Sequence, residues 1–122
     1  MTSRVRAIRG ATRVVSDSSD EVDSATIEMV REMLVRNAVE HEDLVSILFT
    51  CTPDIHSRFP AASARDLGLG DVPLICAVEL DIQDSLPLTI RALITFHSDS
   101  KLADIQHVYL RGAEVLRRDL AQ

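Results

Sequence analysis

The chain has 122 residues, which is room for a single domain (1–122) with one hydrophobic core. Its composition, 46% hydrophobic and 26% charged, is typical of a folded protein and excludes a disordered one. The formal net charge of −6 argues against non-specific nucleic-acid binding, although a single cleft can still be positive. The sequence has neither an apolar run of roughly 18–20 residues nor a secretory signal, so we expect a cytoplasmic protein that does not enter membranes.

The cysteines and histidines limit the chemistry further. Cys51 and Cys76 each lie in an apolar segment without a Cys-x-x-Cys motif, so we expect two buried, reduced thiols. No metal-ligand spacing occurs among the four histidines, so we expect no metal site: His41, His56, His97 and His107.

The first half of the chain predicts a strand, a long helix and a second strand. Residues 4–14 are rich in β-branched side chains and predict a strand with a break around Gly10. Ser18 and Glu21 have capping-box spacing, and apolar residues then recur at helical period over 20–39. Residues 44–52 form a nearly continuous apolar run, which predicts a strand buried on both faces.

The second half adds one short helix and further strands. Pro60 is expected to begin a helix over 60–67, which Gly68 ends. Strands are predicted over 72–80, 89–97 and, shorter, 107–110, while 113–122 has no clear pattern and is expected to be a mobile tail. The order β-α-β-α-β-β predicts an α/β sandwich (α+β), in which a mixed sheet carries one long and one short helix on one face.

Three charged residues interrupt apolar strand patterns. Arg9 shares a strand face with Val5 and an alanine, Glu79 ends an apolar run, and Arg91 lies between apolar neighbours. Such a charge is costly to desolvate unless it finds a partner or faces a polar cleft. Two interpretations stay open: a structural ion pair, or a cleft in which two arginines bind an anion and a carboxylate binds a hydroxyl.

Several short motifs occur in an order that points to a family. They are Ile8-Arg9-Gly10-Ala11-Thr12, Thr52-Pro53-Asp54 followed by Phe59-Pro60-Ala61, Cys76-Ala77-Val78-Glu79, Ile90-Arg91 and His107-Val108-Tyr109-Leu110. Each motif alone is weak, but five in order are specific. Over about residues 6–117 the chain resembles the small monofunctional chorismate mutases of the trimeric α/β class.

The resemblance implies a reaction and an assembly. The reaction is the Claisen rearrangement of chorismate to prephenate, an isomerisation on the route to phenylalanine and tyrosine, which needs no cofactor and no metal. The assembly is a homotrimer, a pseudo-α/β barrel with active sites between adjacent subunits.

The resemblance also implies roles for individual residues. Arg91 would face the ether oxygen of the breaking bond, Arg9 and Tyr109 would bind carboxylates, and Glu79 and Cys76 would lie near the ring hydroxyl. Further substrate-binding positions form the walls, the entrance and the closing tail: Phe59, Arg65, Leu74, Ile75, Leu116 and Arg117.

Two features of the sequence do not fit this assignment directly. Ala62 stands where related chains often carry lysine, which removes one positive charge from the entrance. Cys76 and Glu79 are three residues apart, so a regular strand would point them to opposite faces. Either a bulge turns one of them around, or the two residues of one chain serve different pockets, which we favour.

A second class of function fits the same residues. A trimeric α/β module that binds an anionic metabolite without changing it would need the arginines, but no group aimed at the ether oxygen. Arg91 is the residue that separates this alternative from the enzyme.

Overall fold

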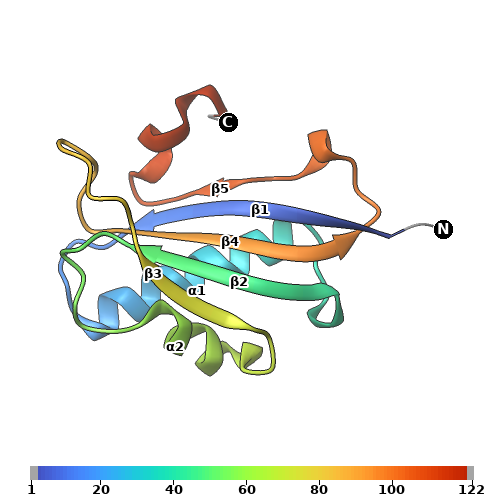
Figure 1. The fold of residues 1–122 in the computed structure, drawn as a ribbon, viewed down its shortest axis with the longest axis horizontal. Coiled ribbons are helices and arrows are strands. Elements are labelled where there is room, and N and C mark those ends of the chain that lie inside the picture. The colour runs from blue at the N-terminus through green and yellow to red at the C-terminus, as the bar shows by residue number, and fades with distance from the viewer. Residues whose placement is uncertain (1–2, 121–122) are drawn as a thin grey trace.

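A computed structural model describes residues 3–120, which form one five-stranded mixed sheet and two α-helices (Figure 1). The spatial order of the strands is β3-β2-β4-β1-β5. Strand β4 pairs antiparallel with both β1 and β2, whereas β3 is parallel to β2 and β5 is parallel to β1. The strands are β1 (Arg4–Arg13), β2 (Leu44–Cys51), β3 (Leu74–Val78), β4 (Thr89–Ser98) and β5 (Val108–Tyr109). The α+β class and the mixed sheet are confirmed.

The expected break in the first strand does not occur. β1 pairs with β4 without interruption from Arg4 to Arg13, straight through Gly10. The glycine has another reason to be there, because an added Cβ would lie 2.9 Å from Cε of Met33 and still closer to its Sδ. Gly10 is therefore the place where the first helix approaches the sheet.

The long helix α1 (Ser19–Arg36) begins as the spacing predicts. The backbone N–H of Glu21 donates to the Ser18 hydroxyl at 3.2 Å, although the Glu21 carboxylate reaches back to the N–H of Val15 and not to the cap residue itself. The helix ends three residues before the expected 39, since Asn37 caps it and Ala38 has a positive φ of 50°.

The short helix α2 (Pro60–Ala64) begins at its proline and continues into a π-helical turn, η2 (Arg65–Leu69). Gly68 takes the left-handed conformation within that turn, with a φ of 103°. Short 3₁₀ turns follow elsewhere: η1 (His41–Asp43), η3 (Leu102–Asp104) and η4 (Ala113–Leu120). The expected tail thus forms 3₁₀ turns over residues 113–120, broken by a kink at Arg117, whose φ of −139° and ψ of 61° are not helical. Residues 121–122 lie outside the described part of the chain.

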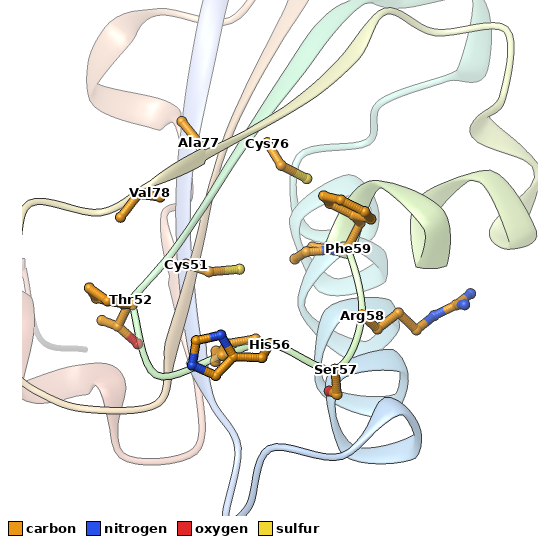
Figure 2. Close-up of a pocket in the computed structure, with 12 residues that line it drawn as sticks. Cys51, Thr52, His56, Ser57, Arg58, Phe59, Cys76, Ala77 and Val78 are labelled. Carbon is orange, nitrogen blue, oxygen red and sulfur yellow. The ribbon is translucent and has the colours of Figure 1, made fainter.

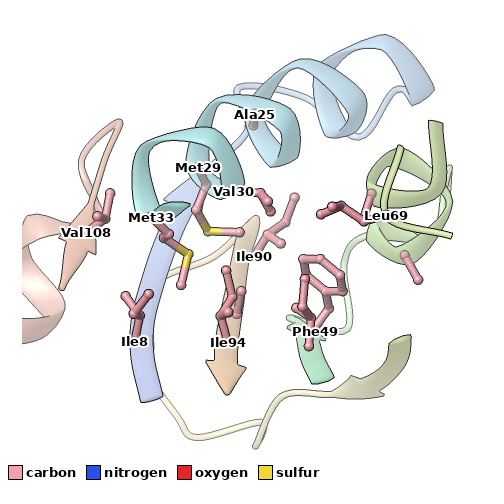
Figure 3. Packing of buried hydrophobic residues seen from close by; sticks show 14 of the residues in the cluster. Ile8, Ala25, Met29, Val30, Met33, Phe49, Leu69, Ile90, Ile94 and Val108 are labelled. Carbon is pink, nitrogen blue, oxygen red and sulfur yellow. The ribbon is translucent and has the colours of Figure 1, made fainter. Parts of the chain in front are cut away.

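Both helices pack on the same face of the sheet. Figure 3 shows Met29 and Met33 of α1 above Ile8 and Ile94, with Phe49 and Leu69 extending the core toward α2. The prediction that β2 is buried on both faces is wrong: Ile47 and Phe49 are buried, but Leu48 between them is 38% exposed. The reason is that no element of residues 3–120 covers β2 on the side of the sheet opposite the two helices. We call this side of the sheet the open face.

The packing at Gly10 can be tested by substitution. We expect Gly10→Ala to lower the free energy of unfolding by about 1–3 kcal/mol, because the new methyl group overlaps the Met33 side chain. Gly70→Ala is the matched control: the nearest atom is Cγ of Arg65 at 3.8 Å and φ is an ordinary −65°, so its stability should change by less than about 0.5 kcal/mol or rise slightly. Denaturant unfolding measures both, and equal stability of the two variants would contradict the close approach.

Candidate active site

The strand register brings the central charged residues together on the open face. Arg91 of β4 lies opposite Thr50 of β2 and Ala11 of β1, and Ala11 in turn lies opposite Tyr109 of β5. Residues directly opposite one another in a sheet point to the same face. Arg9, two residues before Ala11, shares this face by strand alternation.

Glu79 joins the cluster from the end of β3. Its backbone N–H donates to the carbonyl oxygen of Cys51 at 2.8 Å, which continues the ladder one residue beyond the strand. The Thr50 hydroxyl donates to Oε2 of Glu79 at 3.2 Å, and Nε of Arg91 lies 3.8 Å from the same oxygen. The second distance is too long for a hydrogen bond, so the attraction between these two charges is Coulombic.

The cluster surrounds a hollow of about 200 Å³ that Arg9, Leu48, Glu79, Arg91 and Tyr109 help to line. Glu79 and Arg91 are 24% and 41% exposed at their side chains, so they are neither a buried structural pair nor fully solvated. Two guanidinium groups and one carboxylate leave one net positive charge in this hollow, on a chain whose net charge is −6. An anion with a hydroxyl group fits that arrangement better than a cation does.

A second hollow, of about 450 Å³, lies beside the edge strand β3 and is mainly apolar. Figure 2 shows Cys51 and Cys76 projecting from β2 and β3 toward the segment that carries His56 and Phe59. Phe59 is 70% exposed, which is unusual for an aromatic side chain beside an apolar hollow.

Cys76 and Glu79, three residues apart in sequence, line different hollows. The register from Leu74 to Val78 against β2 is regular, so no bulge turns either side chain around. Cys76 packs toward the core and lines the second hollow, whereas Glu79 lines the hollow on the open face. Within one chain the two residues therefore belong to different cavities.

An aspartate that the sequence analysis missed holds the segment before Phe59. The Asp17 carboxylate accepts the backbone N–H groups of His56 and Ser57 at 2.8 and 3.0 Å. Hydrogen bonding from Ser57, and then from the backbone of His56, holds the pKa of Asp17 below its usual value. The contact spans about 40 residues of sequence, and no local pattern marks it.

The remaining predicted positions lie around the two hollows without lining them. Leu74 is half-buried against the core, Ile75 is exposed on the other side of β3, and Arg65 is exposed in η2. Leu116 and Arg117 are half-buried in η4, which packs against β1 and β5 (Figure 1). The structure therefore groups Arg9, Glu79, Arg91 and Tyr109, sets Cys76 and Phe59 apart, and leaves these others at the edges.

Both cysteines are free, as expected, but they are half-buried and not fully buried. The edge position of β3 leaves this end of the sheet only partly covered. Burial, together with the neighbouring Cys76, raises the pKa of the Cys51 thiol to about 12.

Residues 3–120 contain neither a metal-binding cluster nor a membrane-spanning helix. No cluster of three or more His, Cys, Asp or Glu side chains there has an arrangement that could hold a metal ion. None of the helices in that range has the length and apolar character to cross a membrane.

Comparison with known proteins shows which family this chain belongs to. A sequence model of the family described as chorismate mutase type I matches residues 5–120. This chain belongs to the type I chorismate mutase family. The match includes all five strands except the first residue of β1, and it includes Arg9, Glu79, Arg91 and Tyr109.

Individual chorismate mutases are similar to this chain over almost its whole length. The chorismate mutase AroH of Thermus thermophilus is 42% identical over 117 residues, which is 95% of this chain and 96% of that protein. That of Bacillus subtilis is 38% identical over 118 residues, 96% of this chain and 93% of that protein. A solved chorismate mutase from Clostridium thermocellum superimposes with a TM-score of 0.88 at 41% identity, over 90% of this chain and 98% of that one.

The raised pKa of Cys51 predicts a slow thiol. In a Cys76→Ser variant, which removes the lesser cause of the raised pKa and keeps burial, alkylation of Cys51 near neutral pH should still be at least about a hundred-fold slower than that of an ordinary thiol, because each pKa unit above 9.0 lowers the thiolate fraction about ten-fold. The same variant unfolded in guanidinium chloride is the control and should react at the ordinary rate. Rapid labelling of the folded variant would contradict the environment described for Cys51.

Proposed function

We propose that this type I chorismate mutase rearranges chorismate to prephenate on the open face of its sheet, with Arg9, Glu79, Arg91 and Tyr109 as its central residues. The observation that carries the proposal is the grouping of two arginines and one carboxylate around one hollow of an acidic chain. Chorismate carries two carboxylates and a ring hydroxyl, so the charges of substrate and hollow are complementary.

The reaction is intramolecular and pericyclic, so it needs no proton transfer, covalent intermediate or cofactor. A protein accelerates it by holding the flexible side chain of chorismate over the ring and by stabilising charge that develops in the transition state. An acceleration of about a million-fold corresponds to roughly 8 kcal/mol, which these two effects can supply together.

Arg91 is assigned to the ether oxygen, on which negative charge grows as the C–O bond breaks. Its guanidinium is held near Glu79, so it is oriented before the substrate arrives and stabilises the transition state more than the ground state. Glu79, itself held by the Thr50 hydroxyl, is assigned to the ring hydroxyl. Arg9 and Tyr109 on the neighbouring strands are assigned to the carboxylates.

We further propose that a neighbouring copy of the chain completes the site in a homotrimer with a pseudo-α/β barrel. A hollow of about 200 Å³ is smaller than the roughly 300 Å³ at which ligand pockets begin, so one chain supplies only part of the walls. The open face also presents apolar side chains of the kind that assemblies bury, among them Leu48, Ile75 and Leu93.

In this arrangement the second hollow of one chain would meet the open face of the next. Phe59 would then serve as the aromatic wall, with Cys76 and Leu74 beside it, Ile75 on the opposite side of β3 and Arg65 at the entrance. Leu116 and Arg117 would close over the substrate from η4, which already packs against the strands that carry Arg9 and Tyr109. A cytoplasmic location is part of the same proposal and is supported by the two free thiols.

The catalytic role of Arg91 predicts a large and specific loss of activity. Arg91→Ala should fold, yet lose about 100–1000-fold in kcat/KM, because a pre-organised charged donor to the ether oxygen is gone. Arg91→Lys should also be poor, since a flexible ammonium does not reproduce the planar guanidinium. The loss of chorismate absorbance in the ultraviolet measures the rate.

The matched control is Arg31→Ala, which removes an exposed arginine of α1 and should leave kcat/KM unchanged. Near-wild-type activity of either Arg91 variant would contradict the assigned role. If the wild-type chain binds chorismate but leaves its absorbance unchanged, the alternative of a non-catalytic binding module holds instead.

A further inference from the structure

The backbone of Arg9 is held by a side chain from the far end of the sequence. Its N–H donates to Nδ1 of His107 at 3.0 Å, across 98 residues of sequence. Strand β5 pairs with β1 at only two positions, Gly10 with Val108 and Ala11 with Tyr109. The imidazole ring therefore extends this short ladder by one contact, in the position where a backbone carbonyl would normally accept.

The segment before β5 is also fixed from the helix side. The Asn37 side chain donates to the carbonyl oxygen of Gln106 at 2.8 Å and accepts the N–H of Gln106 at 2.8 Å. Asn37 thus ties the segment to the end of α1, while His107 ties it to β1. Between them these contacts set where β5, and with it Tyr109, lies against the strand that carries Arg9.

We propose that His107 is a positioning residue of the active site, whose neutral ring fixes the backbone of Arg9 and the place of Tyr109 relative to it. The inference rests on the proposed function, in which these two residues bind the substrate carboxylates. His107 need not touch the substrate to act, because a small displacement of the β1 backbone moves the Arg9 guanidinium away from its carboxylate.

The contact requires one protonation state of the ring. Nδ1 accepts a hydrogen bond only as the neutral imidazole with its proton on Nε2, and imidazolium offers no acceptor at all. Burial lowers the pKa of His107 below its usual value of 6.5, which keeps the ring neutral at neutral pH. Of the titratable side chains beside it, Arg9 lies on the neighbouring strand β1 and Tyr109 on β5, and burial is the cause of the lowered pKa of His107.

The lowered pKa of His107 determines on which side of neutral pH the contact is lost. Because the folded-state pKa is lowered, the contact is complete above 6.5 and is lost as the pH falls through the folded-state value. Substrate binding should therefore weaken on the acid side while remaining nearly constant around neutral pH.

Two substitutions of His107 distinguish the hydrogen-bond acceptor at Nδ1 from the ability of the ring to titrate. His107→Leu removes the acceptor, and we expect KM for chorismate to rise about ten-fold at all pH values with a smaller change in kcat. His107→Asn keeps an oxygen acceptor near the position of Nδ1 but does not titrate. Its KM should stay within about three-fold of the wild type and should lack the rise at acid pH that we expect of the wild type.

The control is His41→Asn, which changes an exposed histidine paired with Asp71 and should keep both the wild-type KM and its acid limb. Amide hydrogen exchange, read by NMR, provides a measurement that does not need catalysis: the Arg9 N–H should exchange faster in His107→Leu than in His107→Asn.

An unchanged KM in His107→Leu, or an acid limb that persists in His107→Asn, would overturn the positioning role. A wild-type chain that fails to convert chorismate would overturn the proposed function instead. These failures are distinguishable, since Arg9 exchange in the two His107 variants reports the contact whether or not the chain is active.

Discussion

Two helices cover one face of the five-stranded sheet, and the opposite face, which they leave open, carries the charged residues of the candidate site. The apolar residues of β2 and β4 that point away from α1 are still partly exposed, as Leu48 and Leu93 are. Charged side chains can occupy strand positions there without the full cost of burial, which is why Arg91 and Glu79 are tolerated in apolar segments. The same incomplete covering that permits the charges also requires another surface to enclose a substrate around them.

The core and the candidate site are built from alternate residues of the same strands. In β1, Ile8 and Gly10 face α1, whereas Arg9 and the buried Ala11 point to the opposite face of the sheet. The packing of Met33 against Gly10 therefore also sets the position of the backbone that carries Arg9. At the other end of the sheet, the regular β3 points Cys76 and Glu79 into separate hollows. A chain built in this way can contribute to two different sites, one on each side of its edge strand.

Strand and helix periodicity, together with the motif order, were enough to predict the α+β class, the helix cap at Ser18 and the charged residues that the fold gathers. Where prediction failed, the deciding contact was distant in sequence. The apolar run of β2 resembles a strand buried on both faces, and nothing local says that one face stays open. Gly10 suggested a break because its real reason, Met33, lies on another element. Asp17 and His107 act through backbone groups about 40 and 98 residues away, which single-sequence patterns do not show.

In the proposed trimer, one chain supplies the charges of each site and a neighbouring chain supplies the wall. Mixing two inactive variants tests it: Arg91→Ala lacks the charge, and Phe59→Glu places a carboxylate where the wall would face a dianionic substrate. If sites are shared in a trimer, subunit exchange at equal amounts should restore about a quarter of the sites, because those sites combine an intact Arg91 from one chain with an intact Phe59 from the next. No recovery of chorismate turnover, with exchange of the subunits shown by native mass spectrometry, would mean that each chain builds its own complete site.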